Sequence, residues 1–155
     1  MIRVLLPAAV VLLLLGYFRD YIFININFLS GVKYYPNIET DYKLPSQLSF
    51  LNSFTYEQLY YGKFFVTLLF SAAFLLVSIV VIKKLFTDSK YIKWTVYAYI
   101  SLVVLSGIFY SYGMLFDDFN TGYKLSRVFM GFLQSPFVLM VLVPAFKIAE
   151  KNNSQ

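Results

Sequence analysis

The sequence predicts an all-α membrane protein, a four-helix transmembrane bundle with both ends in the cytoplasm (N-in/C-in). Of its 155 residues, 59% are hydrophobic and 14% are charged, whereas soluble domains average about 45–50% and about 25%. The hydrophobic residues form four long runs, and Lys or Arg stands at the ends of most of them. Such runs with basic flanks are typical of membrane-spanning helices. We therefore treat residues 1–155 as a single membrane domain.

The first apolar run, residues 4–18, lies between Arg3 and Arg19. It is shorter than the about 20 residues that cross a hydrocarbon core about 30 Å thick. We expect the helix to cover about 3–23, with its charged residues reaching the interface. A cleaved signal peptide is the alternative, but no clear small-x-small cleavage site follows the run, which favours a retained anchor.

The second run, residues 64–82, contains no charge and is bounded by Lys63 and Lys83. Thr55 and Gln58 have the spacing of a capping box, so we expect the helix to begin at residue 56 and to end near 84. The third and fourth runs predict helices over about 91–116 and 124–148. Pro136 interrupts the fourth run, where neighbouring helices can satisfy the carbonyl that it frees.

The distribution of basic residues predicts the orientation. The short segment 83–93 carries four Lys and one Asp, and a short loop of this kind favours the cytoplasmic side. The outer loop 24–55 is then the only sizeable segment outside the bilayer. It is rich in aromatic residues, and we expect turns at Gly31, Pro36 and Pro45. Within it, the stretch 45–54 mixes Leu and Phe with Ser, Gln and Asn, which predicts a short interfacial helix.

The composition excludes several classes of chemistry. The chain has no Cys and no His, so thiol catalysis, thiolate metal sites and the commonest general base are absent. No membrane run contains Asp or Glu. We expect no catalytic, cofactor-binding or metal site, although a Ser activated by a Lys that lies near it in space stays open. The basic residues bracket apolar runs, and this pattern argues against nucleic-acid binding.

Polar and small residues in the outer half of the membrane are the first candidates for contact with a partner or ligand. Gln134 carries an amide into the fourth run next to Ser135 and Pro136, so its side chain should face a helix or a partner. Gly131 and Ser135 form a small-xxx-small pair, as Gly107 and Ser111 do in the third run. Internal packing is the simpler interpretation of these residues, and binding of another membrane protein is the alternative.

Charged residues near the outer boundary are the other candidates. Arg19 and Asp20 follow the first run, Asp117 and Asp118 follow the third, and Arg127 precedes the fourth. Such residues mostly anchor helices at the interface. Arg19 differs because a short first helix would hold it below the headgroups, where it needs an acidic partner such as Asp20, Asp117 or Asp118.

These features resemble a known family. The segment Tyr17-Phe18-Arg19-Asp20 and the last helix, from Arg127 through Gln134-Ser135-Pro136 to Pro144-Ala145-Phe146, are similar to small exosortase-system-associated membrane proteins of Bacteroidetes. The exosortase F-associated group is the most similar, although Gln134-Ser135 departs from it. Exosortases are membrane transpeptidases that use Cys, Arg and His, so this chain is not such an enzyme. The resemblance implies an accessory subunit in the bacterial inner membrane, with an exosortase-like transpeptidase as partner.

Taken together, the residues favour a non-enzymatic, multi-pass accessory protein of an inner-membrane sorting or surface-export system. Its expected partners are membrane lipid and another integral membrane protein. The alternative is a small-molecule or lipid carrier with a pocket in the outer half of the bundle, and such a pocket would be lined by Arg19, Gln134 or Ser135.

Overall fold

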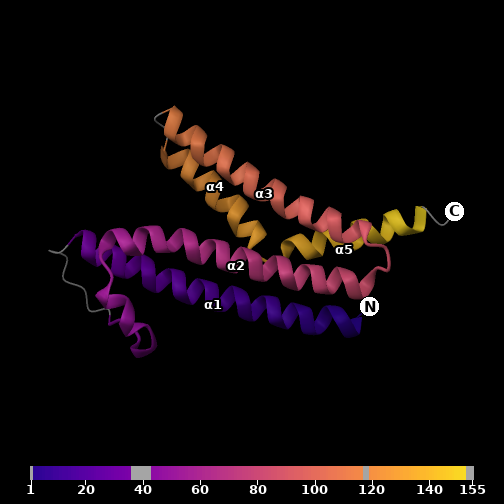
Figure 1. Ribbon diagram of the computed structural model, residues 1–155, viewed down its shortest axis with the longest axis horizontal. Coiled ribbons are helices and arrows are strands. Elements are labelled where there is room, and N and C mark those ends of the chain that lie inside the picture. The colour runs from indigo at the N-terminus through magenta and orange to yellow at the C-terminus, as the bar shows by residue number, and fades with distance from the viewer. Residues whose placement is uncertain (1, 36–42, 117–118, 153–155) are drawn as a thin grey trace.

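The computed structural model of the chain describes residues 2–35, 43–116 and 119–152, and every regular element within these ranges is helical (Figure 1). The elements are α1 (Ile2–Tyr34), the 3₁₀ helix η1 (Ser46–Ser53), α2 (Tyr56–Leu85), α3 (Lys90–Leu115), α4 (Phe119–Leu133) and α5 (Phe137–Asn152). The predicted all-α class is confirmed.

Helix length and composition indicate a membrane protein. The helices α1, α2 and α3 are long and apolar enough to cross a membrane, and α4 with α5 makes a fourth span if this bent pair counts as one. Large apolar side chains cover their outer surfaces; Leu6, Phe65 and Leu115 are 67%, 69% and 79% exposed. Surfaces of this kind suit contact with lipid and would be unfavourable in water.

The first helix is longer than the sequence suggested. The sequence predicts an end near residue 23 and an outer loop over 24–55 with a turn at Gly31, but α1 continues to Tyr34 and includes Gly31. Asn25 is accommodated because its side-chain amide donates to the carbonyl of Tyr21, one turn back, at 2.7 Å. Further along, Ile26 and Leu29 are buried, and this packing outweighs the polar residues among them.

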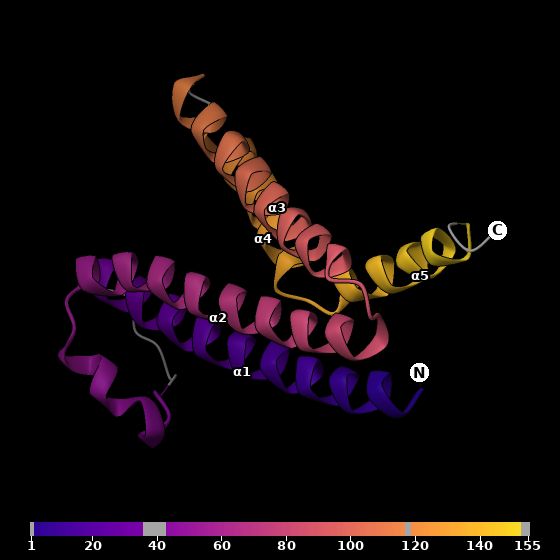
Figure 2. The ribbon, with the colours of Figure 1, turned by 45° about the vertical axis from the view of Figure 1, so that its right-hand side comes forward.

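The buried face at this end of α1 belongs to a small second core. Leu51 of η1 and Leu59 of α2 pack with Ile26 and Leu29, and Lys33 of α1 donates to the backbone carbonyls of η1 and its flank. The short helix predicted over 45–54 is therefore present as η1, and it lies against the end of the α1–α2 pair (Figure 2).

At the start of α2, the predicted capping box is confirmed. The Thr55 hydroxyl accepts from the Gln58 backbone N–H at 3.3 Å, and the Gln58 side chain accepts from the Thr55 N–H at 2.9 Å. These two bonds satisfy N–H groups that a helix leaves without partners in its first turn. They fix the first residue of α2 at Tyr56.

The helices form two antiparallel hairpins that diverge. Helices α1 and α2 run side by side along their length, as do α3 and α4 (Figures 1 and 2). The α3–α4 hairpin meets α2 near the turn between α2 and α3 and leans away from it toward the turn between α3 and α4. This arrangement differs from a closed four-helix bundle.

The main core fills the region where the hairpins meet. Phe74 and Ile82 of α2 are fully buried there, together with Leu133. Three aromatic rings, Phe86, Tyr91 and Phe146, pack within 4.8–5.8 Å of one another and tie the start of α3 to α5. The core therefore seals the half of the protein that contains residues 83–93, while the hairpins separate in the other half.

Close packing between α3 and α4 occurs at a different position from the one predicted. A Cβ atom added at Gly122 would lie 2.5 Å from Gly113 Cα and 2.6 Å from the Phe109 carbonyl oxygen. By contrast, nothing lies within 4 Å of such an atom at Gly107 or Gly131. The small-residue pairs that we singled out therefore do not form this tight contact; Gly113 and Gly122 form it.

Candidate functional site

The candidate site is a buried polar cluster that joins α1, α2 and the segment between α4 and α5. Its centre is Gln134, which is 3% exposed. The Gln134 Oε1 atom accepts from Arg19 Nε at 2.7 Å, and Nε2 donates to Ser71 Oγ and to the Thr67 carbonyl oxygen, each at 2.8 Å. One side chain thus connects three membrane helices.

Arg19 approaches this cluster from α1 and is held from three sides. Besides Gln134, it contacts the Asp20 carboxylate, with Nη1 to Oδ1 at 2.9 Å, and its guanidinium lies 5.6 Å from the centre of the Phe23 ring. The Arg19 side chain is 27% exposed and that of Asp20 is 65% exposed. Of the acidic partners that we considered, Asp20 is the one in contact; Asp117 and Asp118 lie outside the described residues.

The depth of the cluster follows from its position in α2. Thr67 is eleven residues from the first residue of α2, a distance of about 16 Å along the axis. If the 30-residue helix is centred on a hydrocarbon core about 30 Å thick, Thr67 and Ser71 lie well inside that core. In such surroundings, a polar side chain is stable only when its hydrogen-bonding groups are satisfied, and those of Gln134 are.

The break between α4 and α5 places Gln134 in this position. The single helix expected over 124–148 is instead two helices, α4 and α5, which meet at a bend of 59° next to Pro136. Since Pro136 has no N–H for the Phe132 carbonyl, the Ser135 hydroxyl donates to this carbonyl instead, at 2.8 Å. Ser135 Oγ also accepts from the Phe137 N–H at 3.3 Å, at the start of α5.

A second group of polar residues lies where the hairpins begin to diverge. Lys63 is one turn from Thr67 on α2 and is partly buried, and it lies within electrostatic range of Arg127 on α4. Arg127 is exposed and lies 5.7 Å from the centre of the Tyr123 ring. Within residues 2–35, 43–116 and 119–152, neither cation forms an ion pair with a carboxylate. Among the described residues, these two cations therefore carry positive charge that no carboxylate pairs with.

The predicted candidates thus separate into groups. Arg19, Asp20 and Gln134 come together, Ser135 and Pro136 shape the bend beside them, and Arg127 joins Lys63 farther along α4. Gly131 is half-buried with open space around it and belongs to neither group. Lys63, Thr67 and Ser71 are not among the candidates that the sequence predicts. The spacing of four between Thr67 and Ser71 is the signal that could have placed them together on one face of α2.

Those described serines that form hydrogen bonds do so with backbone groups or with other neutral side chains. Ser71 donates to the Thr67 carbonyl at 2.7 Å, Ser78 pairs with the Tyr99 hydroxyl at 2.8 Å, and Ser106 pairs with Ser126 at 2.8 Å. None of the described serines has a Lys or a carboxylate among its hydrogen-bond partners. The described residues also contain no group of three or more His, Cys, Asp or Glu side chains that could hold a metal ion.

No protein-family model, curated protein or solved structure matches this chain.

Proposed function

We propose that this chain is a non-enzymatic accessory subunit of a bacterial inner-membrane protein-sorting or surface-export system, and that it acts by binding another integral membrane protein. In this proposal the chain crosses the membrane four times, with α4 and α5 forming one bent span. Both termini face the cytoplasm because the Lys-rich turn 83–93 favours that side. The resemblance to exosortase-associated proteins supports an exosortase-like transpeptidase as the partner.

The pair of cations between the hairpins is the observation that carries this proposal. Lys63 and Arg127 come from different hairpins, and no described carboxylate compensates them. Charges of one sign repel each other, most strongly where a membrane lowers the dielectric constant. A carboxylate on a partner helix that packs between the hairpins would neutralise this pair.

The extent of the accessible surface also supports a partner. The chain of 18.0 kDa exposes 10734 Å², whereas a compact soluble protein of this mass exposes about 8,000 Å². The excess of about 2,700 Å² is in keeping with an open arrangement of helices in place of a closed bundle. An association that buries part of this surface would reach the size of a standard protein–protein interface, about 1,600 Å² in total.

Co-purification from native membranes tests the proposal. A tagged protein at native expression would be isolated in mild detergent or native nanodiscs, and its partners identified by mass spectrometry. We expect the wild type to recover one integral membrane protein reproducibly and the Lys63→Gln/Arg127→Gln variant to lose it. The matched control is Lys43→Gln/Lys124→Gln, which also removes two positive charges outside the sealed half and should keep the partner.

Two results would count against partner binding. The wild type could recover no reproducible membrane protein, or the control could lose the partner as completely as the test variant does. Recovery of the protein alone with a bound small molecule or lipid would favour the carrier alternative. That alternative requires a cavity lined by Arg19, Gln134 or Ser135. It has less support, because both polar atoms of the Gln134 amide are bonded to protein groups.

A further inference from the structure

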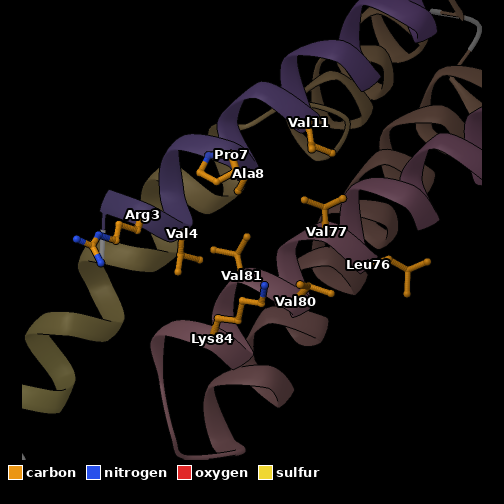
Figure 3. A pocket seen from close by; sticks show the side chains of 10 residues that line it. All are labelled: Arg3, Val4, Pro7, Ala8, Val11, Leu76, Val77, Val80, Val81 and Lys84. Carbon is orange, nitrogen blue, oxygen red and sulfur yellow. The ribbon is translucent and has the colours of Figure 1, made fainter.

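A groove runs between α1 and α2 at the end of the hairpin that is opposite η1. Its volume is about 390 Å³, within the range of small-ligand pockets. It is lined by Arg3, Val4, Pro7, Ala8, Val11, Leu76, Val77, Val80, Val81 and Lys84. Figure 3 shows that the two cations stand at one end of the groove and that the remaining lining residues, all apolar, continue away from them.

The groove exists because the side chains along its floor are small or compact. Val4 and Ala8 of α1 lie across the groove from Val81 and Val77 of α2 (Figure 3). Val81 is 3% exposed and belongs to the main core, whereas Val80 is 53% exposed and forms an open edge. The floor therefore borders the main core, and one side of the groove opens to the surroundings of the helices.

We propose that this groove binds one anionic phospholipid of the leaflet next to Arg3 and Lys84, with its headgroup at the end that carries these two cations and an acyl chain along the apolar floor. Neither Arg3 nor Lys84 forms an ion pair with a carboxylate in the described parts of the chain. Both side chains are exposed, so their charges are accessible to a headgroup. The site is outside the polar cluster at Gln134, and the proposal requires only that the hairpin lies in a membrane.

The length of the groove matches a lipid chain. Arg3 and Val11 are eight residues apart on α1, as are Leu76 and Lys84 on α2, and eight residues of helix extend about 12 Å. One leaflet contributes about 15 Å of hydrocarbon. The apolar floor therefore follows most of one leaflet, with the cations at the level of the phosphates. Two charges confined to one end of an apolar groove match a lipid, with its charged headgroup and apolar chain, better than an apolar partner helix.

Native mass spectrometry of the delipidated full-length protein tests this inference. The protein in mild detergent would be titrated with dioleoyl-phosphatidylglycerol and, separately, with dioleoyl-phosphatidylcholine. Each basic residue at a membrane surface strengthens the binding of anionic lipid several-fold. Two such residues should therefore favour phosphatidylglycerol over phosphatidylcholine by about tenfold or more. The Arg3→Gln/Lys84→Gln variant should lose this preference. The control Lys83→Gln/Lys93→Gln removes two exposed cations from the same end of the protein but outside the groove, and should keep it.

Two further comparisons test the apolar floor. Ala8→Leu places a larger side chain in the groove and should reduce phosphatidylglycerol binding, whereas Ala9→Leu, next to it but outside the lining, should not. Glycerol 3-phosphate in excess should fail to displace the lipid, because it has no acyl chain. Circular dichroism checks that each variant is folded. If Ala8→Leu does not fold, the charge variants still test the site.

Several outcomes would overturn the inference. Equal binding of both phospholipids, an equal loss in the Lys83→Gln/Lys93→Gln control, or displacement by glycerol 3-phosphate would each do so. Loss of a co-purified membrane protein from Arg3→Gln/Lys84→Gln, with phosphatidylglycerol binding unchanged, would assign the groove to a protein partner instead.

Discussion

Replacing Gln134 by Leu is the most direct test of the polar cluster. Leu has a similar size but no polar group, so the variant removes the bond from Arg19 and the two bonds to α2. Interhelical hydrogen bonds in membranes contribute about 0.6 kcal/mol on average and about 1.7 kcal/mol at most. Because the Arg19 bond is charge-assisted, we place it near the upper value. The expected loss in the free energy of unfolding is therefore about 2–3 kcal/mol.

Reversible unfolding in mixed micelles of mild detergent and SDS, followed by circular dichroism, would measure this loss. Ser101→Ala is a suitable control, since the Ser101 hydroxyl is exposed and bonds only to the Tyr97 carbonyl in its own helix. A double-mutant cycle of Gln134→Leu with Arg19→Met should give a coupling energy of about 1–2 kcal/mol. A loss below about 0.5 kcal/mol for Gln134→Leu, or additive effects in the cycle, would refute the role that we assign to the cluster.

Three other predictions concern single positions. Gly122→Ala should destabilise the α3–α4 hairpin by about 1–3 kcal/mol in the same assay, because its Cβ would meet backbone atoms at 2.5–2.7 Å; Gly131→Ala, with open space around it, should be neutral or stabilising. Pro136→Ala restores an N–H that can bond the Phe132 carbonyl, so the bend between α4 and α5 should become smaller. Distances between spin labels on α4 and α5, measured by double electron–electron resonance, would detect this change. Unchanged distances would contradict the prediction. The Lys90 backbone N–H donates to Asp88 Oδ1 at 2.8 Å, and the Lys90 ammonium group contacts Oδ2 at 3.1 Å. The backbone hydrogen bond and, to a lesser extent, the ammonium group lower the pKa of Asp88 below its usual value. Because this pKa is lowered, the contact stabilises the start of α3 at higher pH and is lost as the pH falls through the pKa of Asp88. A carboxyl ¹³C titration that shows no lowering relative to an unfolded peptide would be inconsistent with this contact.

The elements that could be predicted from sequence are those that local chemistry specifies. The start of α2 follows from a capping box, and the break before α5 follows from a proline; both depend on residues a few positions apart. The end of α1 could not be predicted in this way. Asn25 and Gly31 favour a loop by local preference, and only packing of Ile26 and Leu29 on α2 and η1 keeps this segment helical.

The candidate site shows the same limit. The amide of Gln134 in an apolar run indicates that it needs partners. The spacing of Thr67 and Ser71, more than sixty residues away, shows that they share one face of α2, but it does not by itself pair that face with Gln134. Likewise, many pairs of small residues have the spacing of a helix contact. Which pair is used depends on how α3 and α4 pack side by side, and this is set by the whole interface. Long-range pairing of this kind requires the structure.

The length of α1 has a consequence for the membrane that surrounds it. A helix of 33 residues extends about 50 Å, which exceeds the about 40–45 Å of a bilayer with its headgroups. The α1–α2 hairpin must therefore tilt or project, and η1 and the small second core at its end move with it. A thinner bilayer would increase the tilt or the projection, and a thicker one would bring the hairpin closer to the membrane normal. Hydrophobic mismatch would thus set the height of η1 above the lipid.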